Sequence, residues 1–103
     1  MRHPRHDLNA LIHSPVRFSI MCYLGSVDEC EFSLLRDAVD LSDSSLSQNL
    51  TRLDDAGFIT IEKRQYGRQM RTWIASTEAG NEALRNNLMI LREIAERRRP
   101  GDG

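Results

Sequence analysis

Short hydrogen-bonding side chains crowd residues 44–53, which read SSLSQNLTRL. Four polar residues in this stretch recur at spacings of three and four, namely Ser45, Gln48, Asn49 and Arg52. On a helix, residues at these spacings share one face. Asparagine and glutamine amides can pair with adenine, arginine with guanine, and serine with several base edges in the major groove of DNA. The pattern therefore predicts a helix whose polar face reads DNA.

The same stretch also predicts a buried face for this helix. Leu46, Leu50 and Leu53 have helical spacing and would form its apolar stripe. An ordinary solvated helix is the alternative interpretation of the polar face. Such a helix would more often carry glutamate, lysine and alanine, because serine, asparagine and threonine compete for nearby backbone groups. The basic hairpin that is expected directly after this helix favours the interpretation that its polar face reads DNA.

A basic hairpin is expected directly after this helix. The segments FITIEKR (58–64) and MRTWIAS (70–76) alternate as strands do, and QYGRQ between them supplies a glycine for the turn. The hairpin carries four cations, which are Lys63, Arg64, Arg68 and Arg71. Arg64 and Arg68 are expected at the tip, where they can lie on phosphates or enter a minor groove. An edge hairpin protected by charge is the alternative interpretation.

Further helices and a short strand are expected around these two elements. Apolar spacing and cap signals predict helices over 15–24, 34–40, 44–56 and 77–99, and a very short strand at 30–32. The expected N-caps are Ser14, Ser33, Ser42 or Asp43, and Thr77. Gly57 is expected to end its helix in a left-handed conformation. This order of elements predicts an α+β fold, mainly α, around one core.

Composition and charge distribution narrow the class of protein. The chain has 103 residues and a formal net charge of −1, which fits one small globular domain and does not by itself indicate a nucleic-acid partner. The charge is uneven, because residues 27–43 carry six acids and one arginine, whereas 58–75 carry four cations and one acid. No apolar run is long enough to span a membrane, and the N-terminus lacks the apolar core of a signal peptide. A cytoplasmic protein is expected.

The C-terminal segment predicts an assembly helix. Leu84, Leu88, Leu91 and Ala95 follow a 4-3-4 spacing, which is typical of a coiled-coil seam. A domain this small has little surface with which to cover a broad apolar helix, so a second copy of the chain is the favoured partner. We therefore expect a symmetric homodimer with these four residues at its interface.

Residues 31–80 together resemble the winged helix-turn-helix transcriptional regulators of the MarR and ArsR type. LSDSSLSQNLTRLDDAGFI is similar to the family's turn, recognition helix and exit, GRQMRTW to its wing, and STEAG to the entry to its last helix. The resemblance covers roughly residues 14–95 and extends to the short subgroup with a C-terminal dimerisation helix. It implies a two-stranded wing, a DNA-binding core over 1–76 and a dimerisation helix over 77–99, within a single domain.

The resemblance also implies residue roles. The recognition-helix role falls on Ser44, Ser45, Ser47, Gln48, Asn49, Thr51 and Arg52, and the wing role on Lys63, Arg64, Arg68 and Arg71. The implied partner is double-stranded DNA, and the expected function is sequence-specific, dimeric regulation of transcription, more specifically repression. A ligand cavity between the dimer helix and the core would suit the family, but no residue specifies an effector.

Two other functions compete with this interpretation. A winged helix that has become a protein-interaction module would suit the acidic run and the net charge of −1. An enzyme or a metal-loaded sensor is the second competitor, with His3, His6 and His13 as candidate ligands. No cysteine or carboxylate cluster completes such a site, and no nucleophile–base pair or glycine-rich phosphate loop is present. We expect no catalysis, metal or cofactor. We expect Cys22 and Cys30 to be buried free thiols, with a redox switch between them as the less favoured alternative.

Overall fold

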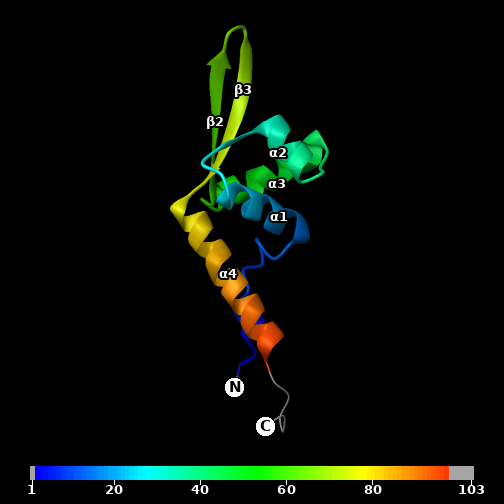
Figure 1. Cartoon of the computed structure of the whole chain (residues 1–103), viewed down its shortest axis with the longest axis vertical. Coiled ribbons are helices and arrows are strands. Elements are labelled where there is room, and N and C mark those ends of the chain that lie inside the picture. The colour runs from blue at the N-terminus through cyan, green and yellow to red at the C-terminus, as the bar shows by residue number, and fades with distance from the viewer. Residues whose placement is uncertain (1, 98–103) are drawn as a thin grey trace.

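The computed structural model describes residues 2–97. Its elements, in chain order, are the 3-10 helix η1 (Pro4–Asp7), α1 (Pro15–Gly25), β1 (Cys30–Glu31), α2 (Phe32–Ala38), α3 (Asp43–Asp55), β2 (Ile59–Tyr66), β3 (Gln69–Ser76) and α4 (Glu78–Glu96). Figure 1 shows an elongated molecule in which the β2–β3 hairpin projects at one end and α4 extends toward the other. This arrangement confirms the α+β fold, mainly α, with a two-stranded wing and a long C-terminal helix.

The hairpin belongs to a three-stranded antiparallel sheet with the strand order β1-β3-β2. Tyr66 pairs with Gln69, so only Gly67 and Arg68 form the loop. Gly67 has a φ of 64°, a positive value that suits the first residue of a two-residue hairpin loop. The turn is therefore tighter than the expected QYGRQ segment, and both strands extend farther toward the tip.

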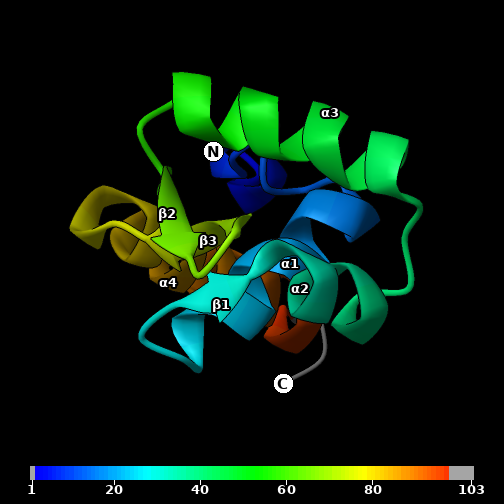
Figure 2. The same ribbon diagram turned by 90° about the horizontal axis from the view of Figure 1, so that it is seen from above.

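Helix α1 lies at the centre of the hydrophobic core, where it contacts α2, α3, α4 and β3. Figure 2 shows α3 along one side of the molecule with α1 beneath it. The core consists of Ile12, Ile20, Met21, Leu24, Cys30, Leu35, Leu46, Leu50, Leu53, Ile59, Ile74 and Leu84. The predicted leucine stripe of α3 is confirmed, and each buried leucine contributes roughly 1.5–3 kcal/mol. This stripe holds α3 on the core.

Two helices end in the same hydrogen-bonded motif. After α3, the Gly57 N–H donates to the Asp54 carbonyl at 2.9 Å, and the Phe58 N–H donates to the Leu53 carbonyl at 3.0 Å. Gly57 has a φ of 77°, which confirms the predicted left-handed cap. After α2, Asp40 takes the equivalent place with a φ of 53°. Because a side chain strains this backbone conformation, Asp40 is a strained position within the helix-turn-helix.

The start of α4 is locked against the corner between α3 and β2. Thr77 confirms its predicted N-cap role, because its Oγ1 accepts a hydrogen bond from the Gly80 N–H at 3.0 Å. The same hydroxyl donates to the Gly57 carbonyl at 2.7 Å. Gly80 is buried, and a Cβ there would overlap the Phe58 carbonyl oxygen. Only glycine lets α4 approach the core this closely, which gives the STEAG motif its physical reason.

Two local predictions for the N-terminal half are wrong. Helix α2 begins at Phe32 after Glu31, so Ser33 is not its N-cap, and the Ser33 hydroxyl instead donates to the Glu31 carboxylate at 3.3 Å. Cys22 is exposed on α1, whereas Cys30 is buried as predicted. Because the residues around Cys22 are mostly apolar, the sequence does not indicate which side chains of α1 point toward the core.

The C-terminal helix is shorter than predicted. Helix α4 begins at Glu78 and ends at Glu96, and Arg97 has an extended backbone. The predicted helical residues 98 and 99 lie outside the described part of the chain. The proposed division into a core over 1–76 and a dimerisation helix over 77–99 remains a prediction.

Candidate nucleic-acid interface

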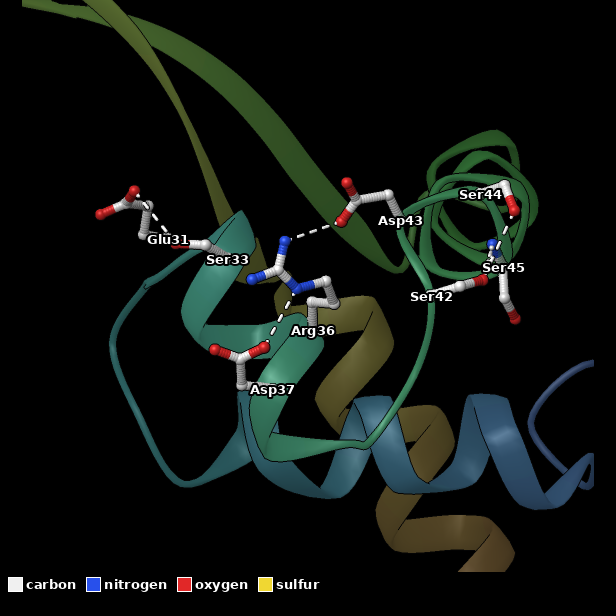
Figure 3. A network of polar contacts seen from close by, with 8 residues as sticks. All are labelled: Glu31, Ser33, Arg36, Asp37, Ser42, Asp43, Ser44 and Ser45. Carbon is white, nitrogen blue, oxygen red and sulfur yellow. Dashed lines mark hydrogen bonds and ion pairs between the residues drawn. The ribbon is translucent and has the colours of Figure 1, made fainter.

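A network of ion pairs and hydrogen bonds joins α3 to α2 (Figure 3). Arg36 of α2 donates from Nη1 to the Asp43 carboxylate at 2.8 Å and from Nε to the Asp37 carboxylate at 3.0 Å. Asp43 is the first residue of α3, so this ion pair spans the turn between the two helices. Of the two predicted N-caps of α3, Ser42 and Asp43, the structure has Ser42, whose hydroxyl accepts a hydrogen bond from the Ser45 N–H at 3.1 Å. The network therefore holds the N-terminal end of α3, where its polar face begins, against α2.

One long face of α3 is open to solvent (Figure 2). It exposes five of the predicted recognition residues, which are Ser44, Ser47, Gln48, Thr51 and Arg52. Within residues 2–97, the Gln48 amide and the Arg52 guanidinium have no hydrogen-bond or ion-pair partner. Both groups are therefore available to base edges or phosphates.

Two predicted recognition residues lie at the edge of this face. Ser45 and Asn49 are half-buried, and α3 packs against α1. Asn49 donates from Nδ2 to the Ser45 carbonyl at 2.8 Å, and its Oδ1 accepts from Nη1 of Arg17 at 3.0 Å. Asn49 is therefore less accessible than Gln48, and its amide already makes two hydrogen bonds within the chain. Its predicted role in reading DNA remains a prediction.

The four predicted wing cations fall into two pairs with different surroundings. Lys63 and Arg68 are exposed and have no acidic partner among residues 2–97. Arg68 lies in the two-residue loop, so its predicted place at the tip is confirmed, whereas Arg64 lies farther down β2. Arg64 and Arg71 are both paired with acids from the segment around β1. The two cations open to a phosphate are therefore Lys63 and Arg68.

Arg64 is the centre of a cluster on the hairpin. Its guanidinium donates to both oxygens of Glu29, at 2.8 and 2.7 Å, and to Glu62 at 3.0 Å. These hydrogen bonds lower the pKa values of the Glu29 and Glu62 carboxyl groups. The guanidinium carbon also lies 5.3 Å from the centroid of the Trp73 ring, a cation–π distance. Trp73 is half-buried against Arg64 and does not belong to the hydrophobic core.

Arg71, the direct cross-strand neighbour of Arg64 on β3, makes a similar arrangement. Its Nη1 lies 3.6 Å from the Glu31 carboxylate, and its guanidinium carbon lies 4.2 Å from the centroid of the Tyr66 ring. Two of the four wing cations thus stack on aromatic rings and pair with glutamates. These contacts hold the wing in shape. Because the glutamates partly neutralise the two guanidinium groups, less of their charge is available to DNA.

A groove of about 370 Å³ separates α3 from the hairpin. It is lined by Phe32, Ser47, Leu50, Thr51, Ile61, Lys63 and Thr72. The fold thus places two predicted recognition residues, Ser47 and Thr51, opposite one predicted wing cation, Lys63. Its lining combines three apolar side chains with three hydroxyl groups and one ammonium, and these polar groups suit contacts to a sugar–phosphate backbone.

The predicted dimer residues on α4 differ in exposure. Leu84 is 8% exposed and belongs to the core of its own chain, whereas Leu88 is 43% exposed. Leu91 is half-buried and Ala95 is exposed. Met89, which would widen the predicted seam, is 63% exposed. Because η1 packs along α4 (Figure 1), the apolar surface left on this helix centres on Leu88 and Met89.

Two polar residues with structural roles, Arg17 and Asn87, escaped the sequence interpretation. Asn87 is 1% exposed, and its Oδ1 accepts a hydrogen bond from the Asn9 N–H at 2.9 Å. The sequence does contain a signal for Asn87, because it lies three residues after Leu84 and four before Leu91, which places a polar amide within an apolar stripe. Arg17 carried no comparable signal, because one arginine early in a helix is common.

The fold and the exposed polar helix beside a basic hairpin define a winged helix-turn-helix protein. The chain belongs to the winged helix DNA-binding domain family, whose match covers residues 16–95. It is similar to an uncharacterised protein of Methanocaldococcus jannaschii, with 27% identity over 86 residues, which span 84% of this chain and 94% of that protein. The winged-helix DNA-binding class expected from the sequence is thereby confirmed.

Solved structures share the fold over nearly the whole chain. A transcriptional regulator homologue from Pyrococcus horikoshii aligns with a TM-score of 0.86 and 23% identity, over 92% of this chain and 96% of that chain. Diamide-treated YodB from B. subtilis aligns with a TM-score of 0.79 and 13% identity, over 97% of this chain and 98% of that chain. Both alignments include the long C-terminal helix together with the winged-helix core.

Residues 2–97 contain neither a membrane-spanning helix nor a cluster of metal ligands. None of the helices there is both long and apolar enough to cross a membrane. No group of three histidine, cysteine or acidic side chains there could hold a metal ion. His3, one of the candidate ligands, instead accepts a hydrogen bond from the Arg5 N–H at 3.0 Å.

Proposed function

We propose that this protein is a sequence-specific regulator of transcription that binds DNA as a homodimer in the cytoplasm and represses by occupying its operator. The observation that carries the proposal is the open polar face of α3, on which Gln48 and Arg52 have no intrachain partner within residues 2–97. In this arrangement α3 enters the major groove, where an amide pairs with adenine and a guanidinium with guanine. Ser44, Ser47 and Thr51 complete the contact surface.

The wing supplies contacts that do not depend on sequence. Arg68 at the tip reaches a phosphate or an adjacent minor groove, and Lys63 faces the backbone that runs between α3 and the hairpin. Arg64 and Arg71 act mainly by holding the hairpin in shape through Glu29 and Glu31. The proposal thus divides the four predicted wing residues into two contacts and two supports.

A homodimer would read two half-sites. A two-fold axis that places one α3 in each of two successive major grooves requires half-site centres about 34–36 Å apart and an inverted repeat in the DNA. The exposed Leu88 and Met89 on α4 support an interface formed by this helix. A small-molecule effector remains unspecified by any residue.

The test begins with selection of bound fragments from genomic DNA by the full chain. The preferred site is then varied one base pair at a time, and the affinities of the wild type and of Gln48→Ala are measured on each variant. Loss of the amide should cost about 1–3 kcal/mol on the preferred site and flatten the ranking at one base pair. Asn86→Ala, which removes an exposed amide on α4, is the matched control and should keep the ranking. An unchanged ranking in Gln48→Ala contradicts base reading by this face.

A protein-interaction module is the second candidate function. The observation in its favour is that Glu29 and Glu31 pair with two of the four wing cations, in a chain whose net charge is −1. A gel shift with genomic fragments at low salt separates the two candidates. DNA regulation requires a shifted complex that competitor DNA of another sequence does not readily displace. Absence of any shift at low salt favours the interaction module.

A further inference from the structure

Arg17 connects three segments of the chain beneath the recognition face. It lies in the first turn of α1 and is half-buried. Its Nε donates to the Leu11 carbonyl at 2.6 Å, and its Nη1 donates to Oδ1 of Asn49 on α3 at 3.0 Å. One planar guanidinium thus holds the segment before α1 and the middle of α3 at the same time.

The amide of Asn49 is fixed by this contact. Its Oδ1 accepts from Arg17, and its Nδ2 donates to the Ser45 carbonyl one turn earlier in α3 at 2.8 Å. Gln48, the next residue back along α3, is exposed and has no partner within residues 2–97. The clamp on Asn49 therefore ties the middle of α3, next to the exposed Gln48, to α1 and to the segment before it.

The segment that anchors Arg17 is itself tied to α4. Oδ1 of Asn9 accepts from the Leu11 N–H at 3.0 Å and from the Ile12 N–H at 3.2 Å, which shapes the turn that presents the Leu11 carbonyl. The Asn9 N–H in turn donates to the buried Asn87 of α4 at 2.9 Å. Hydrogen bonds thus run without a break from the middle of α3 to the buried side of the C-terminal helix.

We infer that Arg17 is a positioning residue for DNA reading: by clamping Asn49 against the Leu11 carbonyl, it fixes the orientation in which α3 presents its polar face. This inference rests on the proposed function, since it concerns the accuracy of base reading. The role requires the fork of a guanidinium, because two bonds in different directions leave from one rigid plane. Lysine carries the same charge on a flexible stem without this fork and cannot replace it.

The DNA experiment compares Arg17→Met and Arg17→Lys with the wild type. The measured quantity is the specificity ratio, which is the affinity for the preferred site divided by that for a scrambled site. A variant that only destabilises the fold lowers both affinities by the same factor and leaves this ratio unchanged. Loss of one charge-assisted hydrogen bond predicts a ratio lower by roughly tenfold in both variants. Arg5→Met removes an exposed cation from η1, outside α3, the wing and α4, and is the matched control, with an unchanged ratio expected.

The same data identify a different role for Arg17. If Arg17 contributes only charge toward phosphate, Arg17→Lys keeps the wild-type ratio and affinity, and the positioning role is overturned. An unchanged ratio in Arg17→Met overturns it as well. In the double variant Arg17→Met with Asn49→Ala, the ratio should fall no further than in Arg17→Met alone, because both changes break one clamp. Independent, multiplying losses contradict action through Asn49.

A measurement without DNA separates this inference from the proposed function. In the NMR spectrum of the free protein, the Arg17 Nε–H and the Asn49 side-chain amide should exchange slowly with solvent. Arg17→Lys should shift the Asn49 amide signals while the backbone signals of α4 stay in place. An unshifted Asn49 amide overturns the clamp. If the wild type keeps the clamp but binds all DNA sequences with the same affinity, the proposed function is overturned instead. The role of Arg17 in base reading is then overturned as well.

Discussion

Arg64 and Glu29 form a bidentate ion pair, with guanidinium nitrogens 2.8 and 2.7 Å from the two carboxylate oxygens. Glu29 lies just before β1 and Arg64 lies in β2, and these strands flank β3 in the sheet. The pair therefore crosses the sheet from one edge to the other, and the guanidinium passes over Trp73 of β3. This contact ties β2 of the wing to the segment that leads into β1 and α2.

Acidification should loosen this tie. The hydrogen bond from Arg64 lowers the pKa of Glu29 below that of an unfolded glutamate, so the pair stabilises the fold above the unfolded pKa. The stabilisation is lost as pH falls below about 4.3 and through the lower folded pKa. Trp73 is the only tryptophan, so its fluorescence should change in this window. Glu29→Gln should alter this transition and Glu82→Gln should not; identical curves for all three proteins contradict the tie.

The two kinds of wing arginine should differ in their salt dependence. Arg68→Met removes a proposed phosphate contact, so the slope of log affinity against log salt concentration should become shallower by about one unit. Arg64→Met removes a cation that already serves Glu29 and Glu62, so its slope should change less while its wing becomes less ordered. Titrations between 50 and 200 mM salt measure both slopes. Equal changes in the two variants contradict the division of the wing into contacts and supports.

The elements of this fold could be predicted because their signals are local. The leucine stripe of α3, the Gly57 cap and the Thr77 cap depend on residues within one or two helical turns, and all three are confirmed. Ser33 shows the limit of such signals. A strand that runs directly into a helix shifts the cap to Glu31, which no single-residue preference indicates.

The site was harder to predict because its side chains have partners far away in the sequence. Arg64 pairs with Glu29 across 35 positions, and Asn49 pairs with Arg17 across 32. Helical spacing places Gln48 and Asn49 on one polar face, yet packing of α3 on α1 leaves Gln48 exposed and half-buries Asn49. Which polar residue is open to a ligand is thus decided by tertiary packing.

The two left-handed helix caps predict opposite effects of a small substitution. Asp40→Gly should raise the free energy of unfolding by up to about 1 kcal/mol, because glycine removes the strain of a side chain at a φ of 53°. Gly57→Ala should lower it by about 1–2 kcal/mol, although a Cβ there meets nothing within 4 Å, because the conformation alone is costly. Urea unfolding measures both. A stabilised Gly57→Ala protein would show that its cap is not left-handed in solution.

The last prediction concerns the surface of α4. Leu88 is 43% exposed in the single chain, so Leu88→Asp should keep the fold while placing a charge in the proposed dimer interface. Burial of an unpaired charge costs more than one leucine contributes, and the variant should therefore be monomeric. Leu84→Asp is the contrast, because Leu84 is 8% exposed and lies in the core of its own chain, so this variant should unfold. Sedimentation gives the mass and circular dichroism gives the fold of each protein. A wild type that is already monomeric at micromolar concentration contradicts the dimer, whereas a folded, dimeric Leu88→Asp protein would move its interface away from this part of α4.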